Sequence, residues 1–150
     1  ASSGSNKHCF QFLQRLIKHK GKCNMKQIVS TKKAPIAIGP YSQAVKANGF
    51  IFVSGQLPVN PETGNFAGTT IEIQTKQSLD NLKAILEVGN SALEKVLKTT
   101  VFLKDMNDFS AMNTIYSQYF SENFPARICV EVARLPKDAL VEVEAIALVE

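Results

Sequence analysis

Arg127 is the residue of this 150-residue chain whose type and position best suit the binding of an anion. It follows Phe124-Pro125, and a proline there favours an extended backbone leading into a strand. The guanidinium can donate two parallel N–H bonds to a carboxylate, and a strand gives it a rigid base. A surface arginine in a weak ion pair, worth about 0–1 kcal/mol, is the alternative interpretation.

Glu142 and Cys129 are the neighbouring candidates for chemistry. Glu142 and Glu144 lie two residues apart on the last predicted strand, so both carboxylates point to one face. Such a carboxylate can orient or deprotonate a water, although an exposed polar edge is the alternative. We expect this strand to pair antiparallel with the Arg127 strand through the connection 134–140. Cys129 shares the face of Arg127 but has no histidine as a base, so a packed, inert thiol is favoured over a nucleophile.

Two further polar groups stand where the chain changes direction. Tyr41 follows Gly39-Pro40 in a rigid turn, and Ser54 precedes Gly55 at the end of a predicted strand. Groups at strand ends often face ligands, but core or turn roles are the simpler interpretation for each residue.

The strands that must position these residues follow a regular pattern from Met25 onward. Asn48-Gly49 is the strongest local signal, because this pair is typical of a two-residue hairpin turn. Residues 58–68 contain two prolines and two glycines, which predicts a loop. Strands are expected at 26–30, 45–47, 50–54, 97–104, 128–133 and 141–148.

Two long helices are expected between these strands. Thr69 and Glu72 have the spacing of a capping box, and apolar residues follow at helical intervals until Gly89, with a short helical turn after Ser91. Asp105 or Asn107 caps the second helix, whose apolar face contains Phe109, Met112, Tyr116, Tyr119 and Phe120.

The order β-β-β-α-β-α-β-β predicts an α+β fold with a mixed sheet and two helices packed on one face. Helices on one side leave the other face of the sheet bare. We expect this exposed face to be buried by association with further copies of the chain.

Residues 1–24 differ in composition from the rest. Residues 1–5 resemble a cloning remnant, and residues 6–24 place apolar side chains on one face of a basic helical pattern. A transit peptide or membrane-surface helix is one interpretation; sequence ahead of a natural start at Met25 is the other. We expect residues 25–150 to form a single domain, with residues 1–24 outside it.

Composition excludes several classes of function. Residues 1–24 contribute +5 to the formal net charge of +4, so residues 25–150 carry −1, which gives no electrostatic basis for binding nucleic acid. Both histidines, His8 and His19, lie in the first 24 residues, which excludes a His-based triad or His-ligated zinc beyond them.

No apolar run is long enough to span a membrane. The single cysteine after residue 24 favours a reducing compartment, hence the cytoplasm, or an organelle if residues 1–24 are a presequence.

Several motifs together resemble the YjgF family and, within it, the reactive intermediate imine deaminase RidA. The resemblance covers essentially all of residues 25–150, and the spacing from Pro-Ala-Arg to Val-Glu-Val-Glu is its most specific part. Ile128 departs from the family pattern, where a small residue is common, and we expect altered packing there. The matching segments are 34–41, 53–58, 77–82, 98–105, 125–127, 130–136 and 141–147.

The resemblance implies a chorismate-mutase-like fold and a homotrimer with clefts between subunits. It implies a 2-iminobutanoate/2-iminopropanoate deaminase that uses no metal and no cofactor. Its substrates would be the imino and enamine acids, such as 2-aminoacrylate and 2-aminocrotonate, that pyridoxal-phosphate-dependent dehydratases release. An endoribonuclease or translation inhibitor, and a holdase chaperone, are the alternatives that the family offers.

The resemblance also implies roles for particular residues. Arg127 binds the substrate carboxylate, and Glu142 positions the attacking water with help from the backbone at Cys129. The same cleft is lined by Tyr41, Ser54 and Asn113, with backbone from Gly39.

Overall fold

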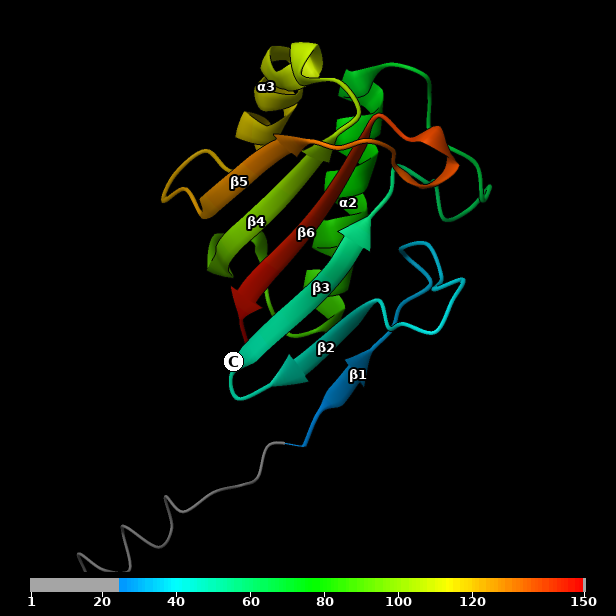
Figure 1. The fold of residues 1–150 in the computed structure, drawn as a ribbon. Coiled ribbons are helices and arrows are strands. Elements are labelled where there is room, and N and C mark those ends of the chain that lie inside the picture. Colours follow the sequence, from blue (N-terminus) through cyan, green and yellow to red (C-terminus); the bar gives the residue numbers. More distant parts are fainter. Residues whose placement is uncertain (1–24, 150) are drawn as a thin grey trace, which may run out of the picture.

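The computed structural model describes residues 25–149, which form a six-stranded mixed sheet with two α-helices (Figure 1). The strand order is β1-β2-β3-β6-β4-β5, with β4 and β5 parallel and every other pair antiparallel. The predicted amphipathic segment and Cys9 and Cys23 lie outside the described residues. The strands are β1 (Gln27–Val29), β2 (Ala44–Ala47), β3 (Phe50–Gln56), β4 (Val96–Leu103), β5 (Ala126–Glu131) and β6 (Val141–Leu148).

The hairpin between β2 and β3 confirms the strongest local prediction. Asn48 and Gly49 have φ values of 51° and 81°, as a two-residue turn with both central residues in the left-handed region requires. The turn sets a register in which Ala47 faces Phe50 and Ala44 faces Val53.

Helices α2 (Ile71–Val88) and α3 (Phe109–Tyr119) cover one face of the sheet, as predicted. The N-cap of α2 is Thr70, whose side chain accepts from the Ile73 N–H, so the prediction of Thr69 was wrong by one residue. Gly89 is the C-cap, as predicted. Buried α2 residues such as Leu82 and Ile85 contribute about 1.5–3 kcal/mol each through burial of apolar surface.

Within residues 25–149, three short 3-10 helices join the other elements: η1 (Leu93–Lys95), η2 (Met106–Asp108) and η3 (Pro136–Asp138). Asp105 caps η2 by accepting from the Asn107 N–H, and α3 begins directly afterwards at Phe109. Ser91 does not cap η1; its hydroxyl donates to the Leu148 carbonyl instead.

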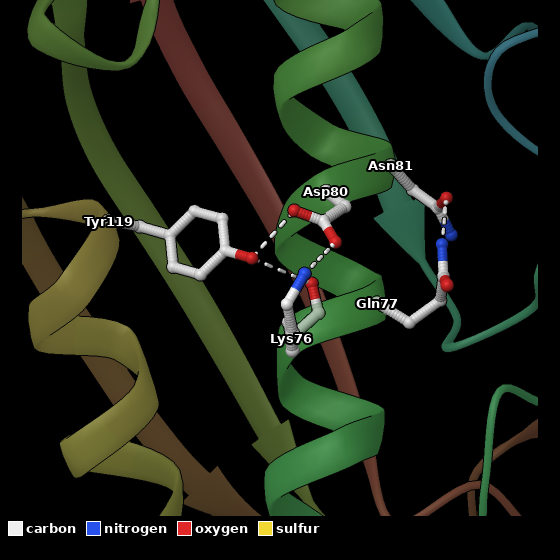
Figure 2. A network of polar contacts seen from close by, with 5 residues as sticks. All are labelled: Lys76, Gln77, Asp80, Asn81 and Tyr119. Atoms are coloured by element: carbon white, nitrogen blue, oxygen red, sulfur yellow. Dashed lines mark hydrogen bonds and ion pairs between the residues drawn. The ribbon is translucent and has the colours of Figure 1, made fainter.

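Helices α2 and α3 are joined by polar contacts as well as by the core. The Tyr119 hydroxyl donates to Asp80 Oδ1 at 2.6 Å, and Lys76 Nζ pairs with Asp80 Oδ2 at 2.7 Å (Figure 2). On α2, Gln77 donates to Asn81, which in turn donates to carbonyls of the loop that follows β3. These bonds hold α3 and that loop against the same helix.

The expected pairing of the last two strands was wrong. β5 does not neighbour β6: β5 pairs in parallel with β4, and β6 lies between β3 and β4. The segment 132–140 therefore crosses the end of β4, where Val132 N–H donates to the Leu103 carbonyl and Lys104 N–H to that of Leu140. β5 also begins at Ala126, two residues earlier than predicted, so Arg127 is its second residue.

The face of the sheet opposite the helices carries large apolar side chains. On β6, the buried residues Val141, Val143, Ala145 and Ala147 alternate with residues that point to this open face. No helix within residues 25–149 is long and apolar enough to cross a membrane. The exposed apolar residues of the open face include Ile28, Phe50, Phe52, Leu97, Ile128, Val130 and Leu148.

Candidate functional site

Arg127 lies on the edge strand β5 and points toward α3. Its Nη1 donates to Asn113 Oδ1 at 2.6 Å, so the structure brings these two predicted site residues together. The guanidinium carbon lies 4.6 Å from the centroid of the Tyr116 ring and 5.7 Å from that of Phe109. Both distances fall within the range of a cation–π contact. Within residues 25–149, Asn113 is the only hydrogen-bond partner of the guanidinium, which leaves its other donors for a ligand.

Tyr116, which contacts the Arg127 guanidinium, is itself held by Thr99 on the neighbouring strand. Their hydroxyls lie 2.7 Å apart in the core, and Thr99 stands directly opposite Arg127 in the β4–β5 pairing. Burial raises the pKa of Tyr116 above its ordinary value, so the phenol stays protonated. Sequence reasoning assigned Tyr116 only to the core. Its position three residues after Asn113, one helical turn, is the signal that would have placed it beside Arg127.

Cys129 follows Arg127 on the same side of β5, half-buried against the core. Burial raises the pKa of its thiol, and the charge of Arg127 only partly opposes that effect. The thiol is therefore protonated near neutral pH, where a thiolate would be the nucleophile. This environment is consistent with the favoured interpretation of Cys129 as a packed, inert thiol.

Glu142 belongs to a second group of residues at the other end of the sheet. Its carboxylate lies over Gly55: a Cβ added at Gly55 would meet Glu142 Cδ at 2.8 Å, and Oε1 closer still. Burial raises the pKa of Glu142, and the neighbouring charge of Glu144 raises it further. Ser54, just before Gly55, donates its hydroxyl to the Ser42 carbonyl at 2.7 Å. Sequence reasoning missed Gly55, although its place between two polar residues at a strand end was visible.

The loop that carries Gly39 and Tyr41 joins this second group. Buried Gln43 anchors the loop: its side chain accepts from Thr31 N–H and donates to three loop carbonyls. The Ser54 N–H donates to the Gln43 carbonyl, which fixes the loop against β3. A pocket of about 460 Å³ opens between this loop and the chain after β3. It is lined by Tyr41, Gln43, Gly55, Leu57, Lys32 and Lys137, among others.

The two groups do not meet within one chain. Arg127 pairs with Thr99, whose side chain is buried on the helix side of β4, whereas Glu142 pairs with Phe102, which points to the open face. The side chains of Arg127 and Glu142 therefore project from opposite faces of the sheet. Asn113 and Cys129 lie on the side of Arg127. Ser54 precedes Gly55, which Glu142 covers, and Tyr41 lines a pocket with Gly55. Gly39 lies next to Tyr41 in the same loop. Within residues 25–149, no three His, Cys, Asp or Glu side chains gather in a way that would hold a metal ion.

The fold and these residues define a small α+β protein with a mixed six-stranded sheet and an arginine aimed from its edge. The family model described as Endoribonuclease L-PSP matches residues 31–149, and the chain belongs to this family, which is also called YjgF, RutC or RidA.

Relatives of known sequence and structure cover nearly the whole described region. A RutC family protein of Pyrococcus horikoshii is 55% identical over 126 residues, 84% of this chain and 100% of the relative. The 2-iminobutanoate/2-iminopropanoate deaminase of Escherichia coli is 50% identical over 127 residues, 83% of this chain and 98% of the relative. The structure of Escherichia coli TdcF with bound serine is 44% identical, with a TM-score of 0.79 over 83% of this chain and 99% of that one.

Proposed function

We propose that this protein hydrolyses reactive 2-imino and enamine acids, such as 2-aminoacrylate and 2-aminocrotonate, to 2-keto acids and ammonia. The observation that carries the proposal is the Arg127 guanidinium, which is held by Asn113 and two aromatic rings with its remaining donors unused within residues 25–149. The 50% identity to a deaminase of this class supports it. Dehydratases that depend on pyridoxal phosphate release such imines, so they are the expected source of substrate.

Arg127 binds the substrate carboxylate through two parallel N–H bonds, which fixes the imine carbon in place. An enamine first takes a proton at C3 from solvent and loses one from nitrogen, which gives the imine. Glu142 holds a water and takes one of its protons as the oxygen attacks C2. The water proton taken by Glu142 passes to the imine nitrogen, so that a carbinolamine forms. Its hydroxyl proton then passes to nitrogen as the C–N bond breaks, and ammonia leaves the keto group behind. An imine carbon is already electrophilic, so orientation of water and substrate supplies much of the acceleration.

This mechanism requires two copies of the chain, because Arg127 and Glu142 face opposite sides of one sheet. We therefore place the active site between subunits of a homotrimer, with Arg127, Asn113 and Cys129 from one copy and Glu142, Tyr41 and Ser54 from the next. The exposed apolar side chains of the open face, Phe52 and Val130 among them, are the surface that assembly would cover.

The first test is release of ammonia and keto acid from 2-aminoacrylate or 2-aminocrotonate generated in the assay. Arg127→Ala is expected to lower kcat/KM by about 100-fold or more, since it removes a bidentate charged contact. A variant that keeps full activity removes Arg127 from the mechanism.

Mixing two inactive variants tests the site between subunits. Arg127→Ala and Glu142→Gln chains are unfolded together and refolded in equal amounts. Random assembly gives about one quarter of the clefts an intact Arg127 from one chain and an intact Glu142 from its neighbour. Activity should return to about that fraction of wild type. If both residues served one site within a single chain, the mixture would stay inactive.

The name of the matching family favours RNA cleavage as a second candidate. Residues 25–150 carry a formal charge of −1 and no histidine, which is a poor basis for binding and cleaving RNA. The discriminating measurement compares the full chain with residues 25–150 alone. RNA binding that disappears with the basic segment is nonspecific, whereas RNA cleavage by residues 25–150 would favour the second candidate.

A further inference from the structure

Tyr116 is the residue in closest contact with the face of the Arg127 guanidinium. The 4.6 Å from the guanidinium carbon to its ring centroid compares with 5.7 Å for Phe109. Tyr116 is 5% exposed, so its ring belongs to the core on one side and supports the cation on the other. Neither the family resemblance nor the names of the relatives give Tyr116 a role.

The ring has little freedom to move. Its hydroxyl shares a 2.7 Å hydrogen bond with Thr99, which is fully buried on the neighbouring strand β4. Its face packs against Phe120, with ring centroids 4.6 Å apart and an angle of 31° between the planes. Thr99 on β4 pairs with Arg127 on β5. Thr99 holds the Tyr116 ring through its hydrogen bond, and its strand partner Arg127 lies over that ring.

We propose that Tyr116, held in place by Thr99, is a positioning residue that fixes the plane of the Arg127 guanidinium for binding a carboxylate. The inference rests on the proposed function only in taking a carboxylate as the ligand of Arg127. Tyr116 itself does not touch the ligand in this scheme and acts through Arg127.

The physical reason lies in the flexibility of arginine. A free arginine side chain has many rotamers, and ordering them on binding weakens affinity. The Asn113 bond fixes one end of the guanidinium, and a ring beneath it removes rotation out of the plane. Two N–H donors then point in one direction before a ligand arrives, which is the geometry that bidentate recognition of a carboxylate needs.

The test compares two variants of Tyr116 with a control on the same helix. Tyr116→Leu removes the ring, and Tyr116→Phe keeps the ring but removes its bond to Thr99. Tyr119→Phe is the control, because Tyr119 also lies on α3 and bonds across helices to Asp80 (Figure 2). Its hydroxyl bonds go to α2 and not to Arg127. All three are expected to lower the unfolding midpoint, so stability alone cannot separate them.

Two measurements separate positioning from stability: calorimetric affinity for 2-oxobutanoate, a keto-acid product, and the NMR order parameter of Arg127 Nε. Tyr116→Leu should weaken binding about 2- to 30-fold, the range of a cation–π contact, and lower the order parameter. Tyr116→Phe should have a smaller effect in the same direction. Tyr119→Phe should leave both quantities at their wild-type values.

The inference is overturned if Tyr116→Leu leaves the Arg127 Nε order parameter and the affinity unchanged, or if Tyr119→Phe lowers both equally. If Tyr116→Leu does not fold, Tyr116→Phe and Thr99→Val decide the matter. They remove the same bond, so their effects on affinity should not add, and full additivity contradicts the proposal. A wild-type protein that releases no ammonia would defeat the proposed function, while the order parameter would still decide the role of Tyr116.

Discussion

Replacement of Gly55 by alanine tests the role of Glu142 with a single methyl group. On the present backbone the new Cβ would lie 2.8 Å from Glu142 Cδ, where ordinary contacts begin at 3.4 Å. The carboxylate must therefore move by more than half an ångström, and Oε1 by more. A shift of about 1 Å in a group that orients a reactant can cost about 100-fold in rate. Gly55→Ala should thus lower kcat by about that factor, equivalent to about 2.7 kcal/mol.

The fold should tolerate this substitution, because the φ of Gly55 lies outside the left-handed region. Ammonia release gives kcat, and thermal unfolding reports the fold. Gly68→Ala is the matched control: its Cβ would lie 2.8 Å from Ile73 Cγ2, a similar clash on the loop before α2, and activity should be unchanged. A folded Gly55→Ala protein with wild-type kcat would show that the position of the Glu142 carboxylate does not limit the reaction.

Four other outcomes follow from the described contacts. The acidic limb of the kcat profile should lie above the usual range of a carboxyl group, because burial and Glu144 raise the pKa of Glu142, and Glu144→Gln should move that limb to lower pH. The pKa of Glu142 is higher in the folded state than in the unfolded state. The contribution of Glu142 to stability is therefore full at pH below its unfolded pKa and is lost as pH rises through its folded pKa. Urea unfolding at a series of pH values measures this loss. For the homotrimer proposed above, Phe52→Glu on the open face should yield folded monomers by light scattering. A variant with the same oligomeric state as the wild type would remove this face from the proposed interface. Gly49→Ala meets open space but forces φ of 81°, so urea unfolding should show a loss of about 1–2 kcal/mol from backbone strain alone.

The local features of the fold could be predicted from the sequence, since each is encoded within a few residues. Asn48-Gly49 specifies its hairpin, and the helices follow from apolar periodicity. The partner of β5 could not be predicted in this way. The connection 134–140 suggested that the last two strands pair antiparallel, but β6 has small or β-branched residues on its buried side and packs between β3 and β4. That choice depends on contacts between distant segments, which no local pattern contains.

The candidate site also has features that the local sequence predicts and features that depend on contacts between distant segments. The chemistry of Arg127 indicated an anion site, and the bond to Asn113 places a second predicted residue beside it. Tyr116 was assigned only to the core because an aromatic residue on an apolar helix face usually belongs there, and its contact with the cation depends on how α3 packs over β5. Arg127 and Glu142 project from opposite faces because of their register with β4, where Arg127 pairs with Thr99 and Glu142 with Phe102. That register could not be predicted without the correct partner of β5.

The separation of the two charges is itself consistent with a binding role for each. Arg127 donates to a neutral amide, which orients the guanidinium without neutralising it. A carboxylate partner in the same chain would compete with the carboxylate of a substrate and would lower the pKa of its own group. Glu142 instead has a raised pKa, with no ion pair within residues 25–149. A half-buried acid and an oriented cation, each without an opposite charge within residues 25–149, are typical of sites that bind and transform a ligand.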